Sequence, residues 1–152
     1  MKILMVCLGN ICRSPLAEGI LKEKIKIQGL DWEVDSAGTG SWHIGEKPDR
    51  RSIAIARQHQ IDLTDQRARQ LKAADLDSFD LLIGMDRSNC DHIIKLSTNP
   101  QQKQKVHLIM DFVYPAQKVE VPDPYYEKDG FEEVYEMIDR ATDAIIEKLR
   151  RN

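Results

Sequence analysis

The sequence predicts an α/β protein with a mainly parallel β-sheet, and three observations support this fold class. Short apolar runs alternate with amphipathic stretches along the chain, which is the pattern of βαβ units. The 152 residues suffice for one domain with a real core. Hydrophobic residues make up 41% of the chain and charged residues 31%, which is an ordinary globular balance.

The first strand and the first helix are expected close to the N-terminus. Residues 2–7 (KILMVC) form an apolar run whose length favours a buried strand over a helix. In the helix that follows, Ser14 is the expected N-cap and Pro15 the first helical residue. Glu18 suits the positive end of this helix, and Gly29 is expected to end it.

The rest of the chain repeats these two patterns. Further strands are expected in WEVDSAGTG, DLLIGM and VHLIM, at residues 32–40, 80–85 and 106–110. Helices are expected at residues 49–59, 87–96 and 130–150, the last of which is amphipathic and packs on the body. Because ligands of parallel sheets bind beyond the carboxyl ends of the strands, Cys7 and the pair Met85 and Asp86 are candidate site positions.

The segment VCLGNICRSP, at residues 6–15, joins the first strand to the first helix and has the composition of an anion-binding loop. It must curl tightly, and Gly9 and Asn10 are the residues that best tolerate a positive φ. A curled loop before a helix directs several backbone N–H groups at one point, and the helix N-terminus adds partial positive charge. Such a nest binds an anion of the size of phosphate.

The spacing Cys-x5-Arg-Ser adds a reactive group to this loop. Cys7 lies beneath the expected anion, where the loop donors and Arg13 favour the thiolate over the thiol. The planar guanidinium of Arg13 can hold two phosphoryl oxygens as charge develops in the transition state. Ser14 can donate a hydrogen bond to the thiolate and help it to leave in a second step. The segment therefore predicts a thiolate nucleophile in a phosphate-binding loop.

Three segments together resemble one known family. VCLGNICRSP is similar to the phosphate-binding loop of the low-molecular-weight protein tyrosine phosphatases, and its string CLGNICRS is highly specific. Residues 85–89 (MDRSN) are similar to the family's MD-x-SN segment, and residues 122–126 (PDPYY) to its DPYY general-acid loop. The resemblance implies a single low-molecular-weight phosphotyrosine phosphatase domain over residues 1–152. It also implies a phosphatase I-like, three-layer α/β/α fold with a central four-stranded parallel sheet of order 2-1-3-4.

The same resemblance implies an activity. The expected enzyme is a protein tyrosine phosphatase that hydrolyses protein phosphotyrosine, and small aryl phosphates, through a phosphocysteine on Cys7. Arg13 then binds the phosphoryl group, and Asp123 protonates the leaving phenol and later deprotonates the attacking water. For Asp86, helix capping and a role in the site both stay open. The phosphate-binding loop implied by the resemblance consists of Leu8, Gly9, Asn10, Ile11, Cys12, Arg13 and Ser14.

Aromatic residues and the remaining cysteines complete the expected site. Trp42, Tyr125 and Tyr126 resemble the aromatic rim of the family's cleft and could sandwich an aryl ring. A deep cradle with such walls admits phosphotyrosine, whereas phosphoserine and phosphothreonine are too short to reach the thiolate. Cys12 either packs inside the loop or, as the resemblance implies, forms a disulfide with Cys7 that protects it from irreversible oxidation. Cys90 is not part of this site and is expected to be an ordinary core residue of a helix.

Composition limits the partners and the compartment. The formal net charge of −3, from 22 basic and 25 acidic side chains, gives no basic excess for nucleic acid, and no apolar run is long enough to cross a membrane. Three cysteines without a secretory spacing favour free thiols in the cytoplasm. The expected partners are a phosphotyrosine protein as substrate, a tyrosine kinase at the level of the family, and inorganic phosphate as product and inhibitor. No metal or cofactor is expected, and ordinary polar or surface positions are expected for His43, His59, His92 and His107.

Other functions stay open at this point. Thioredoxin-coupled arsenate reductases resemble this loop and fold, but they carry a further cysteine pair after the third strand, where this chain has Cys90 alone. A catalytically idle phosphotyrosine-binding module would keep the cradle and lose the nucleophile or the acid, whereas this chain has both Cys7 and Asp123. A broad phosphatase acting on small aryl phosphates would use the same mechanism.

Overall fold

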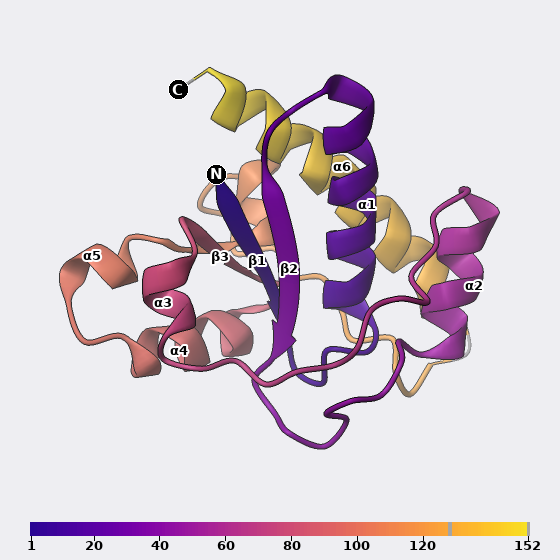
Figure 1. The fold of residues 1–152 in the computed structure, drawn as a ribbon, viewed down its shortest axis with the longest axis horizontal. Coiled ribbons are helices and arrows are strands. Elements are labelled where there is room, and N and C mark those ends of the chain that lie inside the picture. The colour runs from indigo at the N-terminus through magenta and orange to yellow at the C-terminus, as the bar shows by residue number, and fades with distance from the viewer. Residues whose placement is uncertain (128, 152) are drawn as a thin grey trace.

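The central sheet has four parallel strands. In the computed structural model, which describes residues 1–127 and 129–151, β1 (Lys2–Cys7) pairs with β2 (Glu33–Gly38) and β3 (Leu81–Gly84), and β3 pairs with β4 (Val106–Leu108). The strand order β2-β1-β3-β4 confirms the predicted order 2-1-3-4. Because the strands share one direction, their carboxyl ends meet at one edge of the sheet, the lower edge in Figure 1.

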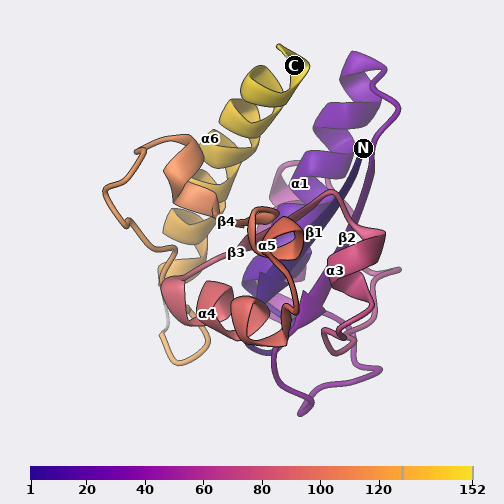
Figure 2. The same cartoon turned by 90° about the vertical axis from the view of Figure 1, so that its left-hand side faces the viewer.

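Helices lie on both sides of this sheet and give the predicted three layers (Figure 1, Figure 2). One side carries the long helices α1 (Arg13–Gln28) and α6 (Gly130–Arg150), with α2 (Arg50–Gln58) beside them. The other side carries α3 (Asp75–Ser78), α4 (Arg87–Leu96) and α5 (Pro100–Lys103), and a 3₁₀ helix, η1 (Ile109–Phe112), follows β4.

Each side of the sheet has its own apolar core, because alternate side chains of a strand point to opposite faces. In β1, Ile3 and Met5 join the larger cluster with α1 and α6, whereas Leu4 and Val6 join the smaller cluster with α3 and α4. All four of these side chains are fully buried. A strand buried on both faces has no polar side, which is why β1 appears in the sequence as a continuous apolar run.

Helix α1 begins one residue before the predicted N-cap, and Ser14 does not cap it. The N-cap is Cys12, with no side-chain cap bond, because the Ser14 hydroxyl is bonded to Cys7 instead. Glu18 was expected to act on the positive end of the helix, but it is buried and accepts a hydrogen bond from the Ser36 hydroxyl at 2.6 Å. The first turns of α1 therefore belong to the loop region rather than to the surface.

The three short elements α3, α5 and η1 were not predicted. Helices α3 and α5 have four residues each, too few to show a helical period in the sequence. The Asn99 side chain caps α5 by accepting the N–H of Gln102 at 2.8 Å. The predicted fourth strand is also too long by two residues, since η1 begins at Ile109.

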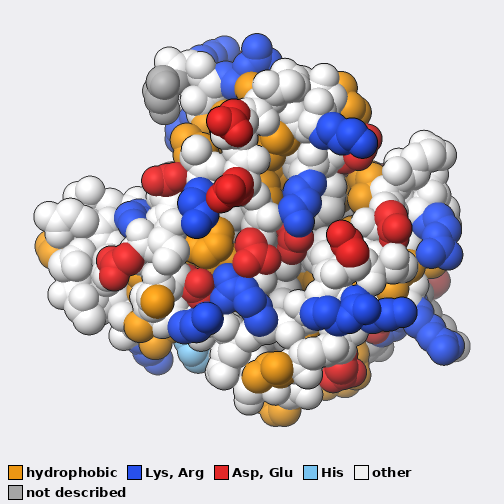
Figure 3. All heavy atoms as spheres, viewed as in Figure 1, with side chains coloured by type: hydrophobic (Ala, Val, Ile, Leu, Met, Phe, Trp, Pro, Cys, Tyr) orange, Lys and Arg blue, Asp and Glu red, His pale blue; other side chains and the backbone are white. Residues whose placement is uncertain are grey.

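The surface carries charges of both signs. Figure 3 shows Lys and Arg side chains interspersed with Asp and Glu over the side of the molecule that carries β2 and α1. Among residues 1–127 and 129–151, no helix has the length and the apolar character that crossing a membrane requires.

Candidate active site

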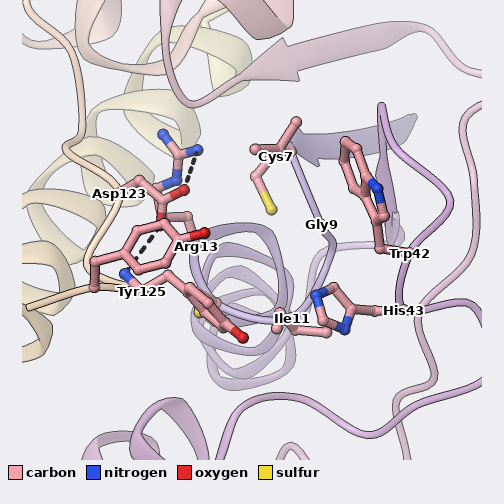
Figure 4. A pocket seen from close by; sticks show the side chains of 11 residues that line it. Cys7, Gly9, Ile11, Arg13, Trp42, His43, Asp123 and Tyr125 are labelled. Atoms are coloured by element: carbon pink, nitrogen blue, oxygen red, sulfur yellow. Dashed lines mark hydrogen bonds and ion pairs between the residues drawn. The ribbon is translucent and has the colours of Figure 1, made fainter.

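A pocket of about 400 Å³ lies beyond the carboxyl ends of the strands. Figure 4 shows the Cys7 side chain pointing into it between two walls, with Trp42 and His43 on one side and Asp123 and Tyr125 on the other. Most of the residues predicted for the site therefore line one cavity, although they come from distant parts of the sequence. The lining consists of Cys7, Leu8, Gly9, Ile11, Cys12, Arg13, Trp42, His43, Asp123, Tyr125 and Tyr126.

Cys7 is the last residue of β1 and lies at the floor of the pocket, only 3% exposed. Its Sγ receives the backbone N–H of Asn10 at 3.3 Å and lies 3.0 Å from the Ser14 hydroxyl. Both neighbours come from the loop and first turn that follow the strand. Donors at these positions stabilise a thiolate more than a thiol.

Asn10 sets the direction of the hydrogen bonds beneath the floor. It is buried in the left-handed region at φ 57°, and its Oδ1 accepts the backbone N–H of Arg69 at 3.0 Å, which fixes the orientation of the amide. Its Nδ2 then donates to the hydroxyls of Ser14 at 2.8 Å and Ser36 at 2.9 Å. Since the Ser14 oxygen accepts from Asn10, its own hydrogen is free to point at Cys7.

Gly9 does not have the conformation that the sequence suggested. Of the two residues expected to tolerate a positive φ, only Asn10 adopts it. The reason for a glycine at position 9 is a close approach, because a Cβ there would lie 3.1 Å from the His43 ring. The loop therefore turns at Asn10, and Gly9 leaves room for the wall above it.

Arg13 is held in place under the pocket and is only 2% exposed. Its Nη1 donates to Asp86 Oδ2 at 2.7 Å and to the backbone carbonyl of Val121 at 2.9 Å. Its Nη2 lies 3.7 Å from Asp123 Oδ2. Burial alone would lower the pKa of Arg13, but the negative charges of Cys7, Asp86 and Asp123 outweigh it and raise that pKa above its ordinary value.

Asp86 has both of the roles that the sequence left open. One carboxylate oxygen caps α4 by accepting the Asn89 N–H at 2.8 Å, and the Asn89 side chain completes a capping box. The other oxygen holds Arg13. Helix capping thus fixes the carboxylate that orients the buried guanidinium.

Asp123 lies in the loop between η1 and α6, beside the Arg13 guanidinium (Figure 4). Its Oδ1 accepts the backbone N–H of Tyr125 at 3.1 Å, and its Oδ2 faces Arg13. This side chain is more exposed than Arg13. It is therefore placed where it can exchange a proton with a group bound in the pocket.

The aromatic residues predicted for the rim form the upper parts of the walls. Tyr125 and Tyr126 pack edge to face, with ring centroids 4.9 Å apart, and Tyr126 is 91% exposed. Trp42 is 70% exposed and folds back over Gly40, where a Cβ would lie 1.9 Å from the indole ring. The rim thus places flat apolar surfaces at the mouth of a pocket whose floor is polar.

His43, which was expected to be a surface or ordinary polar residue, is a partly exposed polar side chain, and it also lines the pocket. Its Nδ1 pairs with Glu46 Oε2 at 2.8 Å, and its ring faces that of Tyr125 at 6.2 Å between centroids. The only signal in the sequence was its position directly after Trp42, because no ligand spacing or partner motif marks it.

Cys12 contributes to the pocket lining and is otherwise buried in a small cluster with Ile11, Ala68 and Phe131. Burial, together with the nearby negative charge of Asp49, raises the pKa of the Cys12 thiol well above its usual range. Cys12 and Cys7 therefore differ in environment, although both are free cysteines. Within the part of the chain that the structure describes, no group of three His, Cys, Asp or Glu side chains could hold a metal ion.

Comparisons with known proteins agree with this geometry. A family model described as low molecular weight phosphotyrosine protein phosphatase matches residues 2–152. A low molecular weight protein-tyrosine-phosphatase of Bacillus subtilis is 36% identical over 151 residues, which cover 98% of this chain and 96% of that protein.

Solved structures show the same similarity. A protein tyrosine phosphatase of Entamoeba histolytica, solved with Hepes in its active site, has a TM-score of 0.92 at 36% identity, covering 99% of this chain and 97% of that one. A Drosophila arginine phosphatase has a TM-score of 0.91 at 33% identity, with 98% of each chain covered. On the strength of the family match over nearly every residue and of relatives at this level of identity, the chain belongs to the low molecular weight protein-tyrosine-phosphatase family of hydrolases.

Proposed function

We propose that this chain hydrolyses protein phosphotyrosine, and small aryl phosphates, through a phosphocysteine on Cys7. In this proposal Arg13 binds the phosphoryl group, and Asp123 acts first as general acid and then as general base. The catalytic unit is a single domain over residues 1–152. The observation that carries the proposal is the shared pocket of these three side chains, in which the Cys7 sulfur has two donors and Arg13 lies 3.7 Å from Asp123.

In the first step the Cys7 thiolate attacks phosphorus, so that an S–P bond forms as the bond from phosphorus to the phenolic oxygen breaks. The loop N–H groups and the free edge of the Arg13 guanidinium stabilise the charge on the equatorial oxygens. Asp123, in its acid form, gives its proton to the leaving oxygen. This transfer matters because the conjugate acid of a tyrosine phenolate has a pKa of about 10.

In the second step a water molecule attacks the phosphocysteine from the side that the phenol has left. The Asp123 carboxylate takes a proton from this water, the S–P bond breaks, and the thiolate leaves with a hydrogen bond from the Ser14 hydroxyl. The products are inorganic phosphate and the free enzyme with Asp123 protonated. The two steps balance without a cofactor.

The walls favour an aryl phosphate over a short alkyl phosphate. Cys7 is buried at the floor, whereas Trp42 and Tyr126 are exposed at the mouth, so a phosphate must stand well away from its peptide to reach the sulfur. Phosphotyrosine has this reach, and its ring can pack on the rim. Phosphoserine and phosphothreonine do not have it.

Further features of the proposal follow from the same chemistry. Inorganic phosphate, the product, fits the loop that binds the substrate and is expected to inhibit. A thiolate nucleophile needs a reducing compartment, so we place the activity in the cytoplasm, with a tyrosine kinase supplying the phosphorylated protein.

Under oxidation, Cys12 is the proposed disulfide partner of Cys7. The disulfide would keep the Cys7 sulfur from passing to irreversible oxidation states.

The test is phosphate release from a phosphotyrosine peptide under reducing conditions, compared between the unchanged chain and Cys7→Ser. We expect release that is abolished in the variant, and acid quenching during turnover should trap one phosphoryl group on the peptide that contains Cys7. Matched phosphoserine and phosphoarginine peptides measure selectivity, the latter because one structural relative is described as an arginine phosphatase.

Each arm can overturn part of the proposal. Absence of release from the folded, reduced chain would rule out the phosphatase activity. Release that persists in Cys7→Ser, with no phosphoryl group on Cys7, would leave a phosphatase with a different nucleophile. Faster turnover of the phosphoarginine peptide would move the substrate from phenol esters to phosphoguanidines.

A further inference from the structure

Arg51, in the first turn of α2, links two loops of the pocket and has no part in the chemistry described above. Its Nε and Nη2 bind the two carboxylate oxygens of Asp49, each at 3.0 Å. Its Nη2 also donates to the backbone carbonyl of Tyr125 at 2.9 Å, and its Nη1 to that of Glu127 at 3.1 Å. The guanidinium further lies 4.5 Å from the ring centroid of Phe131, at the start of α6.

Asp49 ties the same guanidinium to the phosphate-binding loop. Its backbone N–H donates to the carbonyl of Ile11 at 2.7 Å, and its side chain caps α2 by accepting the N–H of Arg51 at 2.9 Å. Although burial alone would raise the pKa of Asp49, the hydrogen bonds from Arg51 outweigh it and hold that pKa below its ordinary value. The carboxylate therefore remains an anchor for Arg51 across the neutral pH range.

The segment around Asp123 has few other attachments. On its N-terminal side, Val121 is fixed by Met85 and Arg13. Among the described residues from 122 to 127, the hydrogen bonds to a separate element are those that Arg51 donates to Tyr125 and Glu127, in addition to the ion pair of Asp123 with Arg13. Arg51 thus closes the C-terminal side of the loop that carries the acid.

We propose that Arg51 is a positioning residue that fastens the loop of residues 122–127 to the phosphate-binding loop, and so aligns Asp123 with the leaving-group oxygen. This inference rests on the proposed role of Asp123 as the acid. A planar guanidinium suits the task, because it can bind a carboxylate with one edge and backbone carbonyls with the other. Lysine, a single point charge, cannot make all four bonds.

The variant that tests this is Arg51→Met, which keeps an unbranched side chain and removes every donor. The side chain of Arg51 is 40% exposed, so the fold should persist, which thermal unfolding would check. Arg50→Met is the matched control, because Arg50 is the exposed neighbour in the same turn. Arg51→Lys is a second variant that keeps the charge.

The first readout is amide hydrogen exchange, which does not depend on turnover. In Arg51→Met we expect faster exchange at Tyr125 and Glu127, with exchange in β1 unchanged, and no such effect in Arg50→Met. Arg51→Lys should lie between them. Unchanged exchange at these amides in Arg51→Met would overturn the proposal, whether or not the chain hydrolyses anything.

The second readout is kcat/KM for two substrates that differ in leaving group. We expect Arg51→Met to lower kcat/KM about tenfold or more for a phosphotyrosine peptide, since small misplacements of a catalytic group are costly. The loss should be several times smaller for p-nitrophenyl phosphate, whose more acidic phenol needs less help from an acid. Equal losses on both substrates would show that Arg51 does not act through proton transfer.

The third readout is a double-mutant cycle with Asp123→Asn. If Arg51 acts through Asp123, adding Arg51→Met to Asp123→Asn should cost less than about twofold. Full additivity of the two losses would overturn the proposal. Turnover that is absent in the unchanged chain would instead count against the proposed function, and the exchange measurement would still decide whether Arg51 holds the loop.

Discussion

The floor of the pocket and its walls differ in burial and in bonding. At the floor, Cys7, Asn10, Arg13 and Ser14 are almost fully buried, and the side chain of each is hydrogen-bonded. At the mouth, the wall residues Trp42 and Tyr126 are exposed. The same cavity therefore has a fixed base under a much less restrained rim.

This difference separates two tasks. Stabilising the charge of a phosphoryl transition state requires donors that do not reorganise during the reaction, and burial with full hydrogen bonding supplies them. Accepting the side chain of a protein substrate requires apolar area that can adjust to a partner. The floor is therefore expected to determine the reaction, and the walls to determine which phosphate ester reaches it. Four changes test this division, beginning with the largest expected effect.

The floor should not tolerate even a conservative change at Arg13. Arg13→Lys keeps the charge but cannot bind Asp86, the Val121 carbonyl and two phosphoryl oxygens together. We expect kcat/KM for a phosphotyrosine peptide to fall by about a thousandfold or more. Arg87→Lys, at an exposed position directly after Asp86, is the control and should stay within about twofold. A loss below tenfold in Arg13→Lys would mean that the buried guanidinium edge is not what holds the phosphoryl group.

Asp123 lies in a wall of the pocket, but its carboxylate contacts Arg13 at the floor. Its replacement therefore tests whether this residue acts in the reaction, as the floor does, or in shaping the pocket, as the walls do. Asp123→Asn keeps the shape and removes the proton. We expect kcat/KM for phosphotyrosine to fall about a hundredfold, and the loss to be much smaller for p-nitrophenyl phosphate. Kinetics with both substrates over a range of pH measure this. A similar loss for both would assign Asp123 to shaping the pocket rather than to proton transfer.

A wall residue should change binding without changing the chemical step. Trp42→Ala removes an exposed ring from the mouth, and we expect KM for a phosphotyrosine peptide to rise about three- to tenfold with kcat within twofold. The free energy of unfolding should change by less than about 0.5 kcal/mol, because the side chain is largely exposed. Ile44→Ala, exposed two residues further on and outside the lining, is the matched control. A large fall in kcat would show that the rim also orders the floor.

The floor was easier to predict from the sequence than the walls were. Cys7 and Arg13 are close in sequence, the apolar run of β1 leads directly to them, and their types and spacing indicate their chemistry. The apolar runs also predicted the buried parallel strands, and the strand order and layers that the family resemblance implied are confirmed. The roles assigned to Cys7, Arg13 and Asp123 stay predictions until they are measured.

Residues that act through distant contacts had no such signal. His43 approaches Gly9, and Arg51 binds the carbonyls of Tyr125 and Glu127, but nothing near either residue in the sequence indicates these partners. Short elements such as α3 and α5 were missed because four residues contain about one helical turn. Sequence patterns thus gave the local chemistry, whereas the contacts between loops required the tertiary structure.

The smallest expected effect concerns the buried end of the floor's hydrogen-bond network. Glu18 accepts from Ser36, which in turn accepts from Asn10, and burial raises the pKa of Glu18 even though Lys22 and Ser36 donate to it. The folded state therefore holds the proton of the Glu18 carboxyl group more tightly than the unfolded state does. The stabilisation that comes from this tighter proton binding is fully present below the ordinary pKa of glutamate, and it is lost as pH rises through the raised pKa.

Glu18→Gln should remove this pH dependence while leaving an oxygen to accept from Ser36. Relative to the unchanged chain, the free energy of unfolding of Glu18→Gln should increase between about pH 4 and pH 7, by on the order of 1 kcal/mol. Denaturant unfolding at several pH values measures this, with the exposed Glu136→Gln as control. kcat/KM should stay within about threefold, since Asn10 can still donate its hydrogen bonds to Ser14 and Ser36 in this variant. A large loss of activity without a pH-dependent change in stability would mean that the floor depends on the charge of Glu18, and not only on its hydrogen bond.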